Sequence, residues 1–122
     1  MAIGYHFSAD CVVTVIETTD IGGTNVASGW LPMAEFQHIS AYVEIGTWDA
    51  TDDLDECRFQ QGIGSGGTTP KDLTTDASGG NYDTDNPVDA DGDFVILEAK
   101  QEDLDSELLY DHVRLYLAEA GN

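Results

Sequence analysis

Acidic side chains are the residues of this chain best suited to chemistry, and metal binding is the chemistry that they suggest. Five aspartates are closely spaced: Asp83, Asp85, Asp89, Asp91 and Asp93. Closely spaced carboxylates can bind a hard cation such as Ca²⁺. An EF-hand loop starting at Asp89 would need glycine at its sixth position and glutamate at its twelfth, where the chain has Phe94 and Lys100. We therefore predict no EF-hand metal site, and two interpretations of segment 83–93 stay open: a different calcium site or a solvated acidic turn.

A glycine-rich segment, GIGSGG at residues 62–67, follows a predicted strand, as phosphate-binding loops do. Phosphate binding at such a loop needs the N-terminus of a following helix or a suitably placed lysine. The next residues are Thr68, Thr69 and Pro70, which supply neither. We interpret the segment as a flexible loop and predict no cofactor.

No catalytic arrangement is visible among the other residue types. The chain has no G-x-S-x-G nucleophile motif, and neither Cys11 nor Cys57 has a neighbouring base in the sequence. Glycosidases use pairs of carboxylates, but such pairs carry no information in a chain with 24 acidic residues. We predict no catalytic residues and no enzymatic activity.

The three histidines, His6, His38 and His112, are far apart in the sequence and show no metal-ligand spacing. His38 and His112 occupy outward positions of two predicted strands. If these strands were neighbours, the two side chains could form a cross-strand pair that binds zinc or responds to pH. We prefer the interpretation that they are ordinary surface residues, and we predict no metal ligands.

The charge excludes several classes of partner. The chain has 24 acidic and 4 basic residues, which give a formal net charge of −20 at pH 7. Binding to nucleic acid or to an anionic membrane surface needs clustered cations, so we predict neither. Because salt shortens the range of charge repulsion to roughly 8 Å at physiological ionic strength, we expect stability to rise with salt. The composition suits seawater or brine, although an acidic surface also serves solubility alone.

Length and cysteine content indicate one ordinary domain. A chain of 122 residues with 41% hydrophobic residues can bury a single core, and no apolar run is long enough to span a membrane. The start of the chain, MAIGYHFSAD, lacks the basic and apolar regions of a signal peptide, so we expect synthesis in a reducing compartment. Cys11 and Cys57 are expected to be buried small hydrophobes, while a bridge between them stays open.

Alternating apolar residues predict the elements that hold these side chains. The pattern is clearest in residues 37–46, whose inward side chains are Ile39, Ala41, Val43 and Ile45. Val113, Leu115 and Leu117 alternate in the same way near the C-terminus. Further strands are predicted, with less regular patterns, at residues 11–16, 26–31, 56–60 and 94–99. Trp30 and Trp48 lie at strand edges, where they could pack on the core or anchor a partner.

Glycine and proline residues break the pattern between Gln61 and Asp93, which predicts one long loop rich in glycine and aspartate. A short strand could lie within it at residues 71–75. Residues 100–109 are too short for a stable helix, so we expect at most one helical turn there. Leu104 and Tyr110 could form a tyrosine corner, with the phenol bonded to backbone upstream. Strands separated by such turns predict an all-β fold, an antiparallel β-sandwich of jelly-roll or immunoglobulin-like type.

Most of the chain takes part in a resemblance to one group of proteins. The segments that carry it are VVTVIETTD, WLPMAEFQHISAYVEIGTW, ECRFQQGIGSGGTTPKDL and FVILEAKQEDLDSELLYDHVRLYLAEAG. They include a Val-x-x-Gly turn at residues 43–46 and a Tyr-x-x-Val-Arg strand at residues 110–114. In this order of features the chain resembles the small β-sandwich head decoration proteins, also called cement or auxiliary capsid proteins, of tailed phages and archaeal tailed viruses.

The resemblance implies a function without catalysis. Such a protein is made in the host cytoplasm, binds the major capsid protein and covers the capsid exterior of the virion as a homo-oligomer, most often a trimer. The polar residues 1–10 would then be an extended arm that lies on the capsid. The alternative that we keep is a β-sandwich module of a tail or cell surface that binds a glycan or receptor, which would display a cluster of exposed aromatic side chains.

Overall fold

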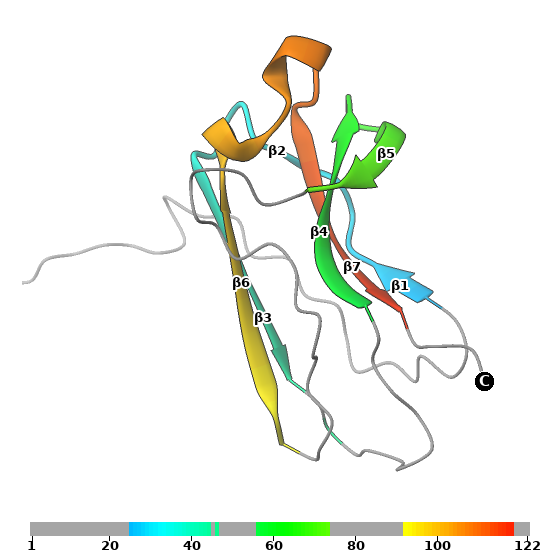
Figure 1. Ribbon diagram of the computed structural model, residues 1–122, viewed down its shortest axis with the longest axis vertical. Coiled ribbons are helices and arrows are strands. Elements are labelled where there is room, and N and C mark those ends of the chain that lie inside the picture. The colour runs from blue at the N-terminus through cyan, green and yellow to red at the C-terminus, as the bar shows by residue number, and fades with distance from the viewer. Residues whose placement is uncertain (1–24, 45, 47–55, 74–91, 119–122) are drawn as a thin grey trace, which may run out of the picture.

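Two antiparallel sheets packed against each other form an all-β sandwich (Figure 1). The computed structural model describes residues 25–44, 46, 56–73 and 92–118. The larger sheet has the order β1-β7-β4-β5, and β2 pairs with β7 beyond the end of β1. The smaller sheet contains β3 and β6. The strand bounds are β1 Asn25–Ala27, β2 Leu31–Pro32, β3 His38–Glu44, β4 Glu56–Ile63, β5 Thr68–Asp72, β6 Phe94–Lys100 and β7 His112–Ala118.

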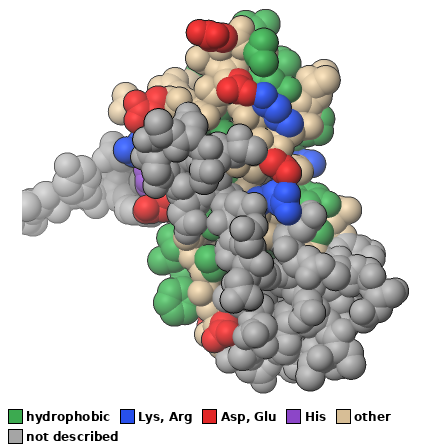
Figure 2. All heavy atoms as spheres, viewed as in Figure 1, with side chains coloured by type: hydrophobic (Ala, Val, Ile, Leu, Met, Phe, Trp, Pro, Cys, Tyr) green, Lys and Arg blue, Asp and Glu red, His purple; other side chains and the backbone are tan. Residues whose placement is uncertain are grey.

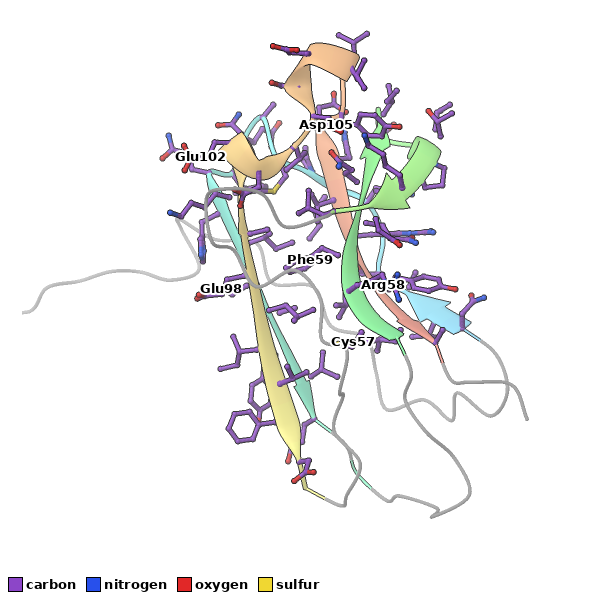
Figure 3. The ribbon with its side chains drawn as sticks, in the orientation of Figure 1. Cys57, Arg58, Phe59, Glu98, Glu102 and Asp105 are labelled. Carbon is purple, nitrogen blue, oxygen red and sulfur yellow. The ribbon has the colours of Figure 1, made fainter. Side chains whose placement is uncertain are left out.

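Strands β4 and β7 form the centre of the larger sheet because their alternation gives each one apolar face. Cys57 pairs with Leu117 and Phe59 with Leu115, and these side chains face the smaller sheet. Figure 3 shows Cys57 and Phe59 on that side of β4 and Arg58 on the other. One face of β4 therefore packs in the core, and the other face is polar.

The smaller sheet closes the core from the other side. Its register pairs His38 with Lys100 at one end and Glu44 with Phe94 at the other. The residues buried between the two sheets are Met33, Val43, Cys57, Phe59, Leu73, Leu97, Ala99, Leu104, Val113 and Leu117. Cys57 is 0% exposed, which confirms the prediction that it is a buried small hydrophobe. Cys11, and with it the question of a bridge, lies outside the described residues.

The strands predicted at residues 37–46, 56–60, 94–99 and near the C-terminus are confirmed, while the one at residues 26–31 is corrected. It is two short strands, β1 and β2, with a break between them. At the break the backbone N–H of Leu115 donates to Ser28 Oγ at 2.9 Å, so a side chain replaces the strand carbonyl. The strand predicted at 11–16 and the arm at 1–10 lie outside the described residues.

The glycine-rich segment is a hairpin turn, so the long loop predicted between Gln61 and Asp93 is wrong for residues 61–72. Strand β4 continues to Ile63, four turn residues follow, and β5 returns along it. Gly64 and Gly67 have φ of 68° and 60°, values that glycine adopts without strain. The short strand expected at 71–75 lies at 68–72 instead.

Two 3₁₀ turns, η1 (Gln101–Asp103) and η2 (Ser106–Leu108), connect β6 to β7 where at most one was expected. The buried Asp103 carboxylate accepts the Lys100 N–H at 2.7 Å and fixes the first turn. Tyr110 does bond backbone upstream, but its hydroxyl donates to Thr69 O of β5 at 2.9 Å. The expected local corner is therefore a link between the η2 region and β5. No helix among the described residues is both long and apolar enough to cross a membrane.

Candidate binding surfaces

The outer face of the smaller sheet carries an apolar patch formed by Tyr42, Phe94 and Ile96. Tyr42 lies opposite Ile96 in the register, and Phe94 lies two pairs further along, opposite Glu44. Their exposed fractions are 60%, 57% and 47%. The rings of Tyr42 and Phe94 stack, with centroids 5.4 Å apart and planes inclined by 26°. Hydrophobic side chains gather over β3 and β6 at the lower left of Figure 2.

Charged side chains surround the apolar patch on the same face. Glu98 lies on the side of β6 that faces away from the larger sheet (Figure 3), and His38 Nε2 is 4.0 Å from its carboxylate. Tyr42 Oη donates to Glu44 Oε2 at 3.3 Å. Loss of hydration around the phenol and the nearby Glu44 carboxylate raise the pKa of Tyr42, so the hydroxyl stays a donor. The patch is apolar at its centre and polar at its rim, as protein-binding surfaces are.

A second apolar feature is the leucine tip, formed by Leu108 and Leu109 at the end of η2. These side chains are 61% and 72% exposed, and Leu109 has a φ of 69°, which is costly for a residue with a Cβ. The tip is anchored below: the Asp105 N–H donates to Gln61 Oε1 at 2.9 Å, and the Asp105 carboxylate pairs with Lys71. It is thus a fixed apolar projection. The neighbouring depression is lined by Leu104, Asp105, Ser106, Glu107 and Leu108.

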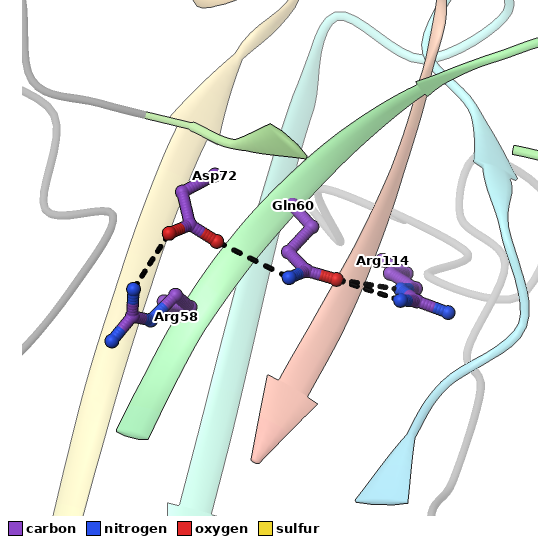
Figure 4. A network of polar contacts seen from close by, with 4 residues as sticks. All are labelled: Arg58, Gln60, Asp72 and Arg114. Atoms are coloured by element: carbon purple, nitrogen blue, oxygen red, sulfur yellow. Dashed lines mark hydrogen bonds and ion pairs between the residues drawn. The ribbon is translucent and has the colours of Figure 1, made fainter. Parts of the chain in front are cut away.

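The outer face of the larger sheet carries a polar row, Asp72–Gln60–Arg114, that crosses three strands (Figure 4). Gln60 Nε2 donates to Asp72 Oδ1 at 3.2 Å, and Arg114 Nε and Nη2 donate to Gln60 Oε1 at 2.9 and 2.7 Å. Arg58 Nη1 donates to Asp72 Oδ2 at 2.6 Å. Two of the four basic residues of this acidic chain therefore lie together on one face.

Aromatic rings lie beside the polar row. The Arg114 guanidinium is 4.6 Å from the centre of the Trp30 ring and 5.8 Å from that of Tyr116. Trp30 lies directly against Gly62 and Gly67, since a Cβ at either residue would come within 3 Å of its ring. Sequence reasoning placed Trp30 at a strand edge; the structure places it on the outer face of the larger sheet, against the hairpin.

The histidines do not form the cross-strand pair that was considered. His38 is in β3 of the smaller sheet and His112 in β7 of the larger sheet, so their strands are not neighbours. His112 Nδ1 is 2.7 Å from Asp111 Oδ1, and the Gly64 N–H donates to the same oxygen at 2.8 Å. These two bonds, the one to His112 foremost, lower the pKa of Asp111. Asp111 therefore links the start of β7 to the hairpin turn.

The other candidate residues can be placed only in part. Of the five aspartates, Asp93 alone is in the described part, so the calcium question lies largely outside it. Within the described ranges, no three His, Cys, Asp or Glu side chains come together as metal ligands would. His6 and Trp48 lie outside them.

Sequence reasoning foresaw parts of these surfaces. The alternation placed Tyr42 and Arg114 on outward faces, which is confirmed. The outward positions of Phe94 and Ile96 were missed because residues 94–97 are all apolar and show no alternation. The polar row was missed because its members are far apart in the chain. A comparison of the chain with known protein families, with curated protein sequences and with solved structures found no match.

Proposed function

We propose that this chain is a non-catalytic structural protein that attaches to another protein through the apolar patch. The proposed partner is the major capsid protein of a tailed virus, and the proposed place is the exterior of the capsid. The chain would act there as a homo-oligomer that decorates or cements the shell. The apolar patch is the observation that carries the proposal.

The position of the patch supports its binding to a partner protein. The alternation of β3 and β6 places Tyr42, Phe94 and Ile96 on the outer face, where polar side chains are usual, yet all three are large and apolar and about half exposed. Burying a large apolar side chain fully is worth roughly 1.5–3 kcal/mol, so covering the exposed part of each contributes about 1 kcal/mol. Such a patch with a polar rim marks an interaction site more often than a chance exposure.

One edge of the smaller sheet adds to this surface. Among the described residues, β3 pairs with β6 alone, so one edge of β3 has no described partner strand. An edge strand presents N–H and C=O groups that another chain can pair with. A partner could therefore cover the patch and extend the sheet at the same time.

The charge of the chain limits the partner to a surface that is not itself strongly acidic. At a net charge of −20, an acidic surface would be repelled unless basic groups lie at the contact. A folded protein surface with apolar and basic groups fits this condition. The resemblance in strand and turn motifs is what points to a capsid among such surfaces.

The test is binding to undecorated virus heads, measured by co-sedimentation. Phe94→Ser with Ile96→Ser removes most of the patch from outward positions, so the fold should persist while head binding falls at least tenfold. Leu108→Ser, which removes an equally exposed apolar side chain outside the smaller sheet, is the matched control and should bind like the unaltered protein. Full binding by the folded double variant would contradict the proposal.

A second function, recognition of a glycan, is favoured by one observation. The stacked rings of Tyr42 and Phe94 are exposed aromatic surface of the kind on which sugars stack. A glycan array separates the two functions. Specific glycan binding that is lost in Phe94→Ser, together with no binding to heads, would favour this alternative.

A further inference from the structure

We propose that the outer face of the larger sheet binds a second copy of this chain across a two-fold axis, with Arg114 of each copy bound to Asp72 of the other. This inference rests on the proposed function, because it names the surface through which the proposed homo-oligomer forms. It concerns the sheet opposite the apolar patch, so attachment and self-association would use different faces.

The polar row is a ladder across adjacent strands. Gln60 of β4 pairs in register with Asp72 of β5 on one side and with Arg114 of β7 on the other. Adjacent strands are about 4.8 Å apart, so the negative and the positive end lie at similar distances from Gln60. Across the sheet the row is negative, neutral and positive.

Arg114 is held in place but not neutralised. Its Nε and Nη2 both donate to the amide oxygen of Gln60, and its planar group lies near the rings of Trp30 and Tyr116. A guanidinium has five N–H donors, so these two bonds leave further donors for a partner. Among the described residues, none offers Arg114 a carboxylate within ion-pair distance, although the chain has 24 acidic residues.

Asp72 is equally able to accept a further bond. Its two oxygens accept one bond each, from Arg58 and from Gln60. The side chain is 41% exposed, and a carboxylate has about four acceptor positions. Asp72 can therefore keep its bonds within the sheet and accept an arginine from outside.

Symmetry makes the polar row complementary to itself. We place two copies so that their larger sheets face each other. A two-fold axis lies in the interface between them, runs parallel to β4 and passes over Gln60. This axis exchanges the two ends of the row. Asp72 of the second copy then lies opposite Arg114 of the first, and the reverse pair forms as well. A contact of this kind uses the same patch on both copies, as two-fold interfaces do.

The charge distribution favours a copy over other partners. Arg58 and Arg114 bring two of the four basic side chains of the chain to this face, beside Asp72, although the net charge is −20. Two acidic copies therefore meet with less repulsion here than at a face without basic side chains. Arginine, tryptophan and tyrosine, all present here, are also the residues enriched at the centres of protein interfaces.

The two-fold contact makes a prediction about copy number that differs from the trimer implied by the resemblance. We expect a dimer, or an assembly of dimers, in solution. Sedimentation equilibrium should be measured where salt shortens the range of the net charge. Arg114→Glu should raise the dimer Kd about a hundredfold, since each dimer loses two equivalent pairs at about tenfold each.

The most direct test of the proposed contact is to mix two variants. Arg114→Glu makes the row negative at both ends, and Asp72→Lys makes it positive at both ends, so neither should pair with itself. Mixed together, the two rows are complementary at both ends and should form a heterodimer. Lys100→Glu, with the same charge change on the smaller sheet, should leave the dimer Kd unchanged.

Each outcome decides the proposal. The proposal is overturned if the unaltered chain is a monomer or a trimer. It is also overturned if Arg114→Glu and Lys100→Glu have equal effects on the dimer Kd, or if the folded variants form no heterodimer. If Asp72→Lys does not fold beside Arg58, the neutral variants Asp72→Asn and Arg114→Gln replace the two charge-reversal variants. Each neutral variant should raise the dimer Kd at least tenfold. An unchanged dimer Kd would contradict the proposal. Loss of the dimer with head binding retained would separate this inference from the proposed function.

Discussion

Single residues explain why the hairpin between β4 and β5 is ordered. The Trp30 ring occupies the space above Gly62 and Gly67, and a Cβ at Gly67 would lie 1.9 Å from its Cε2 atom. Gly67 also has a φ of 60°, where other residues are strained. The indole that borders Arg114 is therefore seated by two glycines, and the polar row depends on them.

Gly67→Ala should destabilise the protein by about 2–4 kcal/mol, because it adds backbone strain of about 1–2 kcal/mol to a steric conflict of similar size. Urea unfolding monitored by tryptophan fluorescence measures this. Gly66→Ala is the matched control, since nothing lies within 4 Å of a Cβ there, and should change stability by less than about 0.5 kcal/mol. Equal midpoints for the two variants would show that Trp30 does not pack on the hairpin.

Asp111 is a second residue with a measurable role. Its bonds to His112 and to the Gly64 N–H lower its pKa, so the carboxylate contributes stability above its unfolded pKa of about 3.9. This contribution is lost as pH falls through the lower folded pKa. Because the side chain is 49% exposed, we expect less than about 1 kcal/mol.

The measurement is the difference in thermal stability between the unaltered protein and Asp111→Asn. Comparing the two proteins at each pH cancels the effect of the other acidic residues, because these titrate in both proteins. The unaltered protein should be the more stable above about pH 5, and the gap should close below about pH 4. A gap independent of pH would mean that the carboxylate is not what holds the turn.

Elements show how far the sequence could predict this molecule. Strands β3, β4 and β7 were predictable because one face of each is buried, which imposes a period of two on the residues. Strand β6 was predictable because its apolar run has the length of a strand. The hairpin at residues 61–72 was not, because its glycines follow from the packing of Trp30, a contact across the fold. The division of residues 26–31 follows from one hydrogen bond of Ser28, which no periodicity reveals.

Binding surfaces depend on strand pairing and so were only half predictable. The alternation gives the face of Tyr42 and of Arg114 but not their neighbours. The apolar patch needs the β3–β6 register, and the polar row needs the order β7-β4-β5, which joins residues 60, 72 and 114. The fixed leucine tip, with the strained backbone of Leu109, likewise follows from links between η2 and β5.

For the whole molecule, the two proposals give different roles to opposite sides of the sandwich. The smaller sheet would bind a partner through its apolar patch, and the larger sheet would bind a second copy through its polar row. A chain with a net charge of −20 needs such defined places of contact, because most of its surface repels a copy. In an assembly of dimers, two apolar patches would face away from each other and could bridge neighbouring capsid subunits.

Hydrogen exchange of the protein, alone and bound to heads, tests most directly that the smaller sheet is the surface of attachment. Amides of β3 and β6, at residues 38–44 and 94–100, should exchange more slowly on the heads, because the partner covers the apolar patch on these two strands. Amides of β4 should be unchanged. Slower exchange in the larger sheet alone, or no change in β3 and β6 on saturated heads, would contradict the account.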